Sequence, residues 1–512
     1  MSAGVSAIRH GRILIPCAAA GFLMLFLLQA NTVLGLGALL VLGCLALMFR
    51  WPELGTLVVL FAIYSNIAVL AMRSHAAIEA TAGSAEQNPR ITMVLALLSL
   101  LLCVPLVHYF VIRKERLLFD RGFILMLVFF GALLASSLFA KDQRTVTSEI
   151  LDFLLEGLVI YLLLTNVVRD SSTLRRAIWT LLLAGSLMGG LSILQKVTHT
   201  ENNIYGGLAQ VGAEINLSPS GREVIGKLRV AGPIGETNRY AQILLVLLPL
   251  AVLRFRLGKS RLSKAAALTA AGLIFGGLLL TYSRAILLTG VLLFAAMAWM
   301  RFLRPRHFVI SALGVALFVA VFEPDIVTRM ASLARLKGLF GHTYTAYQAP
   351  DSSSMRRYVE NAAAWHTFLD HPVFGVGPGQ FAEYYSQAYG NRVGLIEQTK
   401  KYRGHNLYLE TLAETGLIGF ASFLAILFVI MHGLWKQRSR LKITHPQLAD
   451  TATGFFLCLA AYGTTAIFTH LSYQRYFWLL LALASSTIRI IDSEATVVAP
   501  QSQESSWLEP SD

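Results

Sequence analysis

Apolar residues in this chain are grouped in blocks of about 17 to 22 positions, and short charged stretches separate the blocks. An α-helix rises about 1.5 Å per residue, so such a block matches the roughly 30 Å hydrocarbon core of a bilayer. The pattern predicts fourteen membrane-spanning helices, or about twelve if closely spaced pairs merge or re-enter the membrane. The predicted spans are 13–30, 32–49, 54–72, 91–112, 122–140, 150–168, 177–194, 239–256, 265–281, 285–300, 307–322, 415–435, 452–471 and 474–490.

Composition supports a membrane protein. The 512 residues are 55% hydrophobic and 14% charged, whereas soluble domains carry about 25% charged residues. We therefore expect an all-α, polytopic integral membrane protein in contact with membrane lipids. The formal net charge of +14 would suggest a nucleic-acid partner in a soluble chain. Here cytoplasmic Lys and Arg explain the charge, and no nucleic-acid partner is expected.

Loops of two kinds alternate along the chain. RKERLLFDR (113–121) and KQRSRLK (436–442) are short and basic, whereas 195–238 and 323–414 are long and rich in Gly, Asn, Ser and Tyr. Because basic loops stay in the cytoplasm, the two long loops should face outward and both termini should be cytoplasmic. The predicted regions are N-terminal transmembrane helices (1–194), an outward loop (195–238), transmembrane helices with arginine motifs (239–322), a large outward loop (323–414), C-terminal transmembrane helices (415–490) and a disordered cytoplasmic tail (491–512).

The larger outward loop contains its own helical pattern. The text SMRRYVENAAAWHTFLDHP has an apolar side, and Pro372 ends it. FGVGPGQF follows; it lacks the Lys and Ser/Thr of a phosphate-binding loop, so it reads as a turn. We expect this loop to form a helical cap on the membrane domain.

Five arginines are predicted near the outward face: Arg239, Arg284, Arg356, Arg357 and Arg403. An arginine in or near hydrocarbon costs a few kcal/mol unless it finds a partner or reaches the interface. Any one of them alone is explained as an interface anchor. Several guanidinium groups on one face instead indicate a polyanionic ligand, because their paired donors suit phosphate oxygens.

His405 stands at the start of RGHNLYLETLAETGLIGF (403–420). A helix beginning near it would place Gly416 and Gly419 on the His face, where they would permit close approach of a neighbouring helix or a lipid chain. Glu410 and Glu414 would lie elsewhere, so neither glutamate should orient the imidazole. A histidine at the outer boundary suits a general base, although a helix cap or a headgroup contact explains it equally well. Arg403, a backbone carbonyl and a distant carboxylate stay open as the group that positions the ring.

No metal or cofactor is expected. His366 and His371 lack the spacing of a helical metal pair, and no cluster of outward carboxylates offers a divalent-metal site. Tyr408 is a candidate for stacking on a sugar ring, although an interfacial aromatic belt predicts it too.

Several motifs together resemble the bacterial O-antigen ligases and the related O-antigen and exopolysaccharide polymerases. HNLYLETLAETGLIGF follows the loop text HPVFGVGPGQF, as in that family. GPIGETNRYAQILL (232–245), LLTYSRAILL (279–288) and SSMRRYVENAAAW (353–365) also resemble family motifs. The resemblance covers roughly residues 230 to 440, while the first seven spans match only in hydropathy.

The resemblance implies a fold of the multi-span GT-C glycosyltransferase type in the bacterial inner membrane, active on the periplasmic face. It implies transfer of a glycan from undecaprenyl pyrophosphate to a sugar hydroxyl, of lipid A–core for a ligase or another lipid-linked repeat for a polymerase, without metal and with inversion. By resemblance His405, Arg239 and Arg284 are the catalytic residues. The substrate-binding candidates are Arg356, Arg357, Arg403, Asn406 and Tyr408.

Two other functions remain open at the level of sequence: a multi-span transporter, for example of a small anion, and a non-catalytic envelope scaffold. A transporter should carry charged residues inside its spans or show two related halves. No internal repeat is visible, and most charges lie at span ends. These features favour the enzyme.

Overall fold

A computed structural model describes residues 43, 45–71, 97–217, 223–303, 352–385, 404–470 and 474–498. Within these ranges seven helices are long and apolar enough to cross a membrane, and four shorter apolar helices accompany them. The prediction of an all-α polytopic membrane protein is therefore confirmed. The predicted spans 13–30 and 307–322, and most of 32–49, lie outside the described residues, so the number of twelve to fourteen spans stays a prediction.

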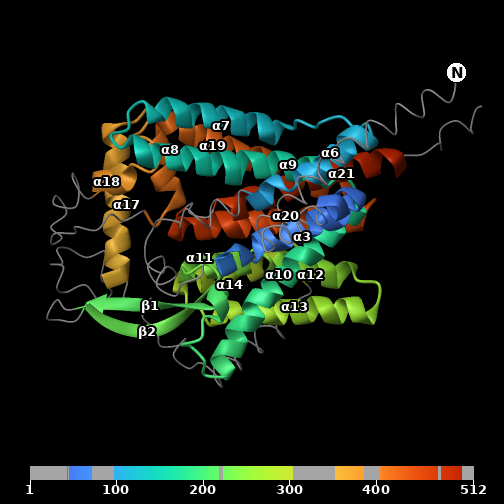
Figure 1. Ribbon diagram of the computed structural model, residues 1–512, viewed down its shortest axis with the longest axis horizontal. Helices are drawn as coiled ribbons and strands as arrows, with labels where there is room; N and C mark the ends of the chain where they lie inside the picture. Colours follow the sequence, from blue (N-terminus) through green and yellow to red (C-terminus); the bar gives the residue numbers. More distant parts are fainter. Residues whose placement is uncertain are drawn as a thin grey trace, which may run out of the picture.

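The helices lie side by side in one bundle, with segments far apart in the sequence as neighbours (Figure 1). A hydrophobic core runs through the bundle and includes the fully buried Tyr161, Leu245 and Trp478. The helices are α3 (Pro52–Tyr64), α6 (Cys103–Val107), α7 (Arg121–Ser137), α8 (Gln143–Asp152), α9 (Ile160–Val167), α10 (Ser171–Val197), α11 (Thr237–Leu245), α12 (Leu248–Leu257), α13 (Arg261–Leu279), α14 (Arg284–Trp299), α17 (Ser352–Asp370), α18 (Phe381–Tyr384), α19 (Leu407–Leu441), α20 (Pro446–Thr465) and α21 (Arg475–Val498).

Short polar residues start several of these helices. The Asp170 side chain accepts hydrogen bonds from the backbone N–H groups of Ser172 and Thr173 at the start of α10, and Ser260 does the same for Ser263 at α13. Such caps satisfy N–H groups that have no partner within the helix. Burial raises the pKa of Asp170, but the bonds from Ser172 and Thr173 outweigh it and leave the pKa lowered.

Helix α17 runs across one end of the bundle, roughly perpendicular to the bundle helices (Figure 1). We call this end the cap end. Val359, Ala363 and Ala364 of α17 are buried in one cluster with Phe381 of α18 and Ala413 of α19. For the described residues, the predicted helical cap is thus present in α17 and α18. Helix α19 begins here at Leu407 rather than at 415, and its basic C-terminal turns lie at the other end of the bundle.

A two-stranded antiparallel hairpin, β1 (Gln210–Leu217) and β2 (Glu223–Gly232), also projects at the cap end (Figure 1). Its register pairs Gln210 with Gly232 and Leu217 with Glu223. We predicted only a loop there. The strand signal was present, because QVGAEINL alternates polar and apolar residues with a period of two.

Helix α19 is broken at Gly416, whose backbone is non-helical (φ 62°, ψ −166°). The loop after α17 fills the break: Val376 N donates to Ala413 O at 3.1 Å, and Leu417 N donates to Pro372 O at 2.8 Å. These bonds pair backbone groups that the break would otherwise leave unsatisfied. The FGVGPGQF turn is therefore a structural partner of α19.

The break corrects one expectation about His405. A continuous helical face from His405 to Gly419 is wrong, because the chain leaves the helical conformation at Gly416. A Cβ at Gly416 would stand 2.3 Å from the backbone of Val373, and one at Gly375 (φ 69°) would stand 2.3 Å from that of Glu414. The glycines therefore permit close approach, but of a loop rather than of a neighbouring helix or a lipid chain.

A buried ion pair holds α21 against the first half of the chain. Arg475 Nη1 donates to Glu156 Oε1 at 2.9 Å and Nη2 donates to Asn66 Oδ1 at 3.2 Å. The exposed fractions of the Arg475 and Glu156 side chains are 0% and 1%. Asn66 Nδ2 in turn donates to Pro233 O at 2.7 Å. The pair thus supports the turn that leads into α11.

Candidate active site

His405 lies at the entrance of α19 and pairs with a carboxylate from another helix. Its Nδ1 is 2.7 Å from Oε2 of Glu360 on α17. Glu360 is fully buried, whereas the His405 side chain is 17% exposed. In the tautomer with the proton on Nδ1, Glu360 accepts this hydrogen bond and a lone pair on Nε2 is left for an incoming hydroxyl. This is the arrangement that a general base requires.

The carboxylate that orients His405 is therefore a distant one, the third of the possibilities left open by the sequence. Glu414, close to His405 in sequence, instead accepts a hydrogen bond from Phe381 N at 3.3 Å. Arg403, another of those possibilities, lies outside the described residues.

A second histidine stands against the first. The rings of His405 and His470 meet edge to face, with centroids 5.9 Å apart. Leu407 N donates to Thr469 O at 2.9 Å and so holds the α19 entrance against the end of α20. Nε2 of the buried His470 is 3.8 Å from Oε2 of Glu236, which connects the histidines to the turn before α11.

Arg239 is almost completely buried, with 1% of its side chain exposed. Its Nη1 donates to Gln242 Oε1 at 2.7 Å, and Nε lies 3.9 Å from Oε2 of Glu236. Among the described residues, neither Nε nor Nη2 has a hydrogen-bond partner. A buried guanidinium with unused donors is suited to hold an anion.

Gln242 fixes the direction of Arg239. Its amide nitrogen donates to Thr465 Oγ1 of α20 at 2.7 Å, so its Oε1 is left to accept from the guanidinium. The same amide nitrogen lies 3.4 Å from the backbone oxygen of Tyr462, also on α20. Helices α11 and α20 therefore hold the arginine jointly.

Arg284 is the first residue of α14 and is half-buried. The residue before it, Ser283, donates its hydroxyl hydrogen to Asn238 Oδ1 at 2.8 Å. Asn238 precedes Arg239, so this bond ties together the two backbone segments that carry the predicted catalytic arginines. A helix N-terminus beside them adds backbone N–H groups that favour anions.

Asn406 and Tyr408 have structural roles in the described contacts. The Asn406 side chain caps α19 by accepting from Tyr408 N and Leu409 N at 3.1 and 3.3 Å. The Tyr408 hydroxyl donates to Gly463 O at 2.8 Å. Their predicted contact with substrate stays a prediction.

The remaining substrate-binding candidates are described only in part. Arg357 is half-buried on α17, and Arg356 lies on the same helix, but its side chain is outside the described part, as is all of Arg403. Across the described residues, no group of three or more His, Cys, Asp or Glu side chains is placed to hold a metal ion.

Glu236, Glu360 and His470 were missed by sequence reasoning. Glu236 and Glu360 lie inside motifs quoted above, GPIGETNRYAQILL and SSMRRYVENAAAW, where the arginines drew attention. Both glutamates lie close in the sequence to arginines predicted at the outward face, and this proximity was the signal that could have identified them. His470 ends a predicted span and carried no such signal.

Comparison with known proteins agrees with the sequence motifs. The model of the O-antigen ligase family matches residues 240–424, a range that contains Arg284, Glu360 and His405. The chain is also similar to the teichuronic acid biosynthesis protein TuaE of Bacillus subtilis (strain 168), with 24% identity over 188 residues. That match covers 36% of this chain and 35% of TuaE, about a third of the length of the relative. Residues 240–424 of this chain are thus similar to the O-antigen ligase family.

Proposed function

We propose that this protein transfers a glycan from an undecaprenyl-pyrophosphate-linked donor to a sugar hydroxyl at the cap end, without a metal. The observation that carries the proposal is the Glu360–His405 pair at 2.7 Å. It lies within the range that matches the O-antigen ligase family model. His470 and Glu236 connect it to the buried Arg239, which retains unused donors. In this proposal the protein lies in a bacterial inner membrane, with the cap end periplasmic and both termini cytoplasmic.

The reaction begins at the acceptor hydroxyl. His405 Nε2 takes its proton while Glu360 stabilises the imidazolium through Nδ1–H. The acceptor oxygen then bonds to the anomeric carbon, and the carbon–oxygen bond to the pyrophosphate breaks from the opposite face. The configuration at this carbon is therefore inverted.

The leaving pyrophosphate takes the electron pair of the broken bond, and its new charge needs compensation. Arg239 and Arg284 would supply it, since charge-assisted contacts placed before reaction cost no reorganisation during it. An ion pair with Glu236, whose Oε2 lies 3.9 Å from Nε, helps to hold Arg239 in place.

Two acceptors fit this chemistry: the sugar of lipid A–core for a ligase, and the terminal sugar of a second lipid-linked repeat for a polymerase. The product distinguishes them. A polymerase yields a ladder of lipid-linked chains from the donor alone, whereas a ligase yields no product until lipid A–core is added.

The decisive experiment compares the wild-type chain and His405→Ala in proteoliposomes supplied with lipid-linked glycan extracted from source cells that lack this protein. We expect transfer by the wild type and a loss of about 10²- to 10⁴-fold in the variant, at equal protein level and thermal stability. Wild-type activity in His405→Ala would disprove the general base. Transport of a small anion without glycan transfer would favour the transporter alternative instead.

A further inference from the structure

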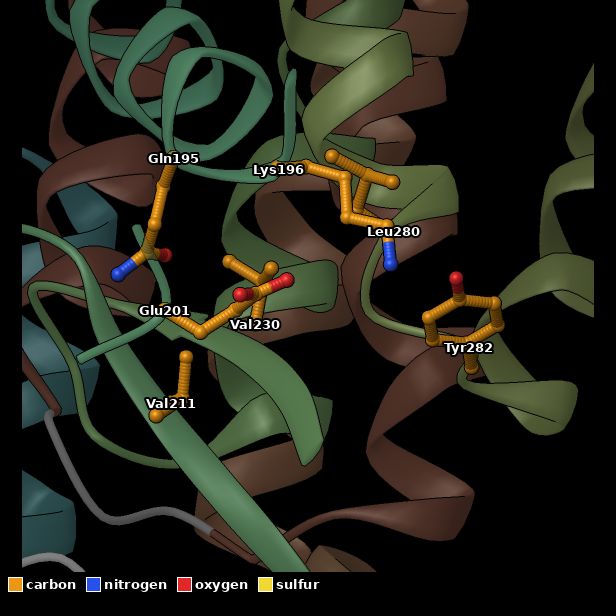
Figure 2. A pocket seen from close by; sticks show the side chains of 7 residues that line it. All are labelled: Gln195, Lys196, Glu201, Val211, Val230, Leu280 and Tyr282. Atoms are coloured by element: carbon orange, nitrogen blue, oxygen red, sulfur yellow. The ribbon is translucent and has the colours of Figure 1, made fainter. Parts of the chain in front are cut away.

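A small cavity of about 230 Å³ lies at the cap end, outside the site described above. The C-terminal end of α10, the hairpin and the turn between α13 and α14 surround it (Figure 2). Drug-sized ligands occupy pockets of about 300–1,000 Å³, so this cavity suits a smaller group. Its lining residues are Gln195, Lys196, Glu201, Val211, Val230, Leu280 and Tyr282.

Gln195 provides the strongest sign of a ligand. Its side chain is fully buried, and its amide nitrogen donates to Asn203 O at 2.9 Å and Ala209 O at 2.8 Å. These two bonds fix the orientation of the amide. The oxygen faces the other lining residues in Figure 2, and it has no partner among the described residues. A buried acceptor left unpaired costs about 1–3 kcal/mol, so a donor from outside the chain would relieve this cost.

The other lining groups indicate which class of ligand would supply this donor. Lys196 and Tyr282 can donate hydrogen bonds and Glu201 can accept them, while two valines and a leucine provide an apolar surface. A sugar ring matches this mixture, because its hydroxyls both donate and accept and its C–H face is apolar. A lipid tail has no donor for Gln195 Oε1, and neither has a simple anion.

The backbone at Tyr282 is also unusual. Its φ is +50°, a conformation that is uncommon for a bulky residue and that clusters at functional sites. Neighbouring bonds hold it there, since Arg229 Nε donates to Thr281 O at 2.8 Å. The backbone is thus held in a costly conformation at a residue that lines the cavity.

Short segments join the cavity to the site. Tyr282 precedes Arg284 by two residues. Val230 follows Arg229, whose Nη2 lies 3.5 Å from Oδ1 of Asn238. We infer that this cavity is a sugar-binding subsite, which holds one ring of a substrate glycan away from the bond that forms. The inference rests on the proposed function and extends it to recognition of the glycan.

The test uses Tyr282→Phe, which removes one hydroxyl, and Glu201→Gln in the full chain. Tyr205→Phe is the matched control, since its hydroxyl contacts Thr200 at 3.1 Å and does not line the cavity. In the transfer assay we expect the KM for one glycan to rise about tenfold, because unpaired groups in a binding site penalise a ligand, with kcat within twofold. A rise in the donor KM places the donor glycan in the cavity; a rise in the acceptor KM places the acceptor.

A second measurement does not depend on catalysis. Glycan released from the lipid is titrated against His405→Ala with and without Tyr282→Phe, and the dissociation constant should rise about tenfold in the double variant. Unchanged KM and dissociation constant would overturn the subsite while leaving the transfer activity intact, as would a fall in kcat at constant KM. Tyr282-dependent binding, together with a wild-type chain that transfers no glycan, would overturn the proposed function and keep the subsite.

Discussion

The Glu360–His405 and Glu156–Arg475 pairs join the same kinds of group in different surroundings. In each pair a buried carboxylate is hydrogen-bonded to a side-chain nitrogen, at 2.7 and 2.9 Å. His405 retains 17% exposure and a second ring nitrogen, whereas Arg475 is wholly enclosed and cannot be deprotonated in proteins. Only the first pair can exchange a proton with a bound molecule. The second can only hold its helices together.

Breaking the enclosed pair should have the largest effect on stability. Arg475→Met leaves the Glu156 carboxylate buried without its charge partner, which costs roughly 3–5 kcal/mol. We expect loss of folded protein or a large fall in the free energy of unfolding, measured by denaturant titration in detergent.

The double variant Arg475→Met/Glu156→Leu is the control, since replacing both partners by apolar groups can be neutral or stabilising. Recovery of stability in the double variant would confirm a structural role. Equal stability of Arg475→Met and wild type would show that the pair does not stabilise the fold.

Glu360→Gln should reduce catalysis by about 10²-fold, because the carboxylate no longer fixes the tautomer of His405. The fold should persist, since glutamine has nearly the same shape. The measurement is kcat in the transfer assay together with thermal stability.

Glu360→Asp separates charge from packing. Aspartate keeps the carboxylate but fills the space less well, so it should retain more activity than glutamine if the charge is what matters. The reverse order of activities would assign Glu360 a packing role.

The smallest effect is expected at Asn406. Asn406→Ala removes the cap of α19 and should lower the free energy of unfolding by about 1 kcal/mol, whereas Asn406→Ser should retain most of the stability. Both are measured by thermal unfolding alongside KM. A raised KM in both variants, with stability kept in Asn406→Ser, would instead support the predicted contact with substrate.

The features that depend on local sequence pattern could be predicted from the sequence. Apolar blocks predicted the membrane helices among the described residues, and the motif around His405 predicted the similarity to the O-antigen ligase family. Helical phase around His405 could exclude Glu410 and Glu414, but it addresses only neighbours within a few turns. Glu360 stands 45 positions away, so only folding of the cap brings it to the ring.

Two other features could not be predicted from the sequence for the same reason, because distant segments meet only in the folded chain. Glu156 and Arg475 are 319 positions apart, and each looked like an ordinary charge in its own segment. Gly416 resembled a helix-packing glycine. Its role as a break became visible only with the loop from Pro372 to Gly377 laid against it.

That loop also has a consequence for biosynthesis. The backbone groups freed at Gly416 find hydrogen-bond partners in residues that precede α19 in the chain. The ribosome therefore synthesises these partner residues before the broken helix. The loop is therefore available when α19 enters the membrane, where exposed polar backbone costs several kcal/mol per group. Moving residues 352–385 to the C-terminus by circular permutation would reverse this order of synthesis.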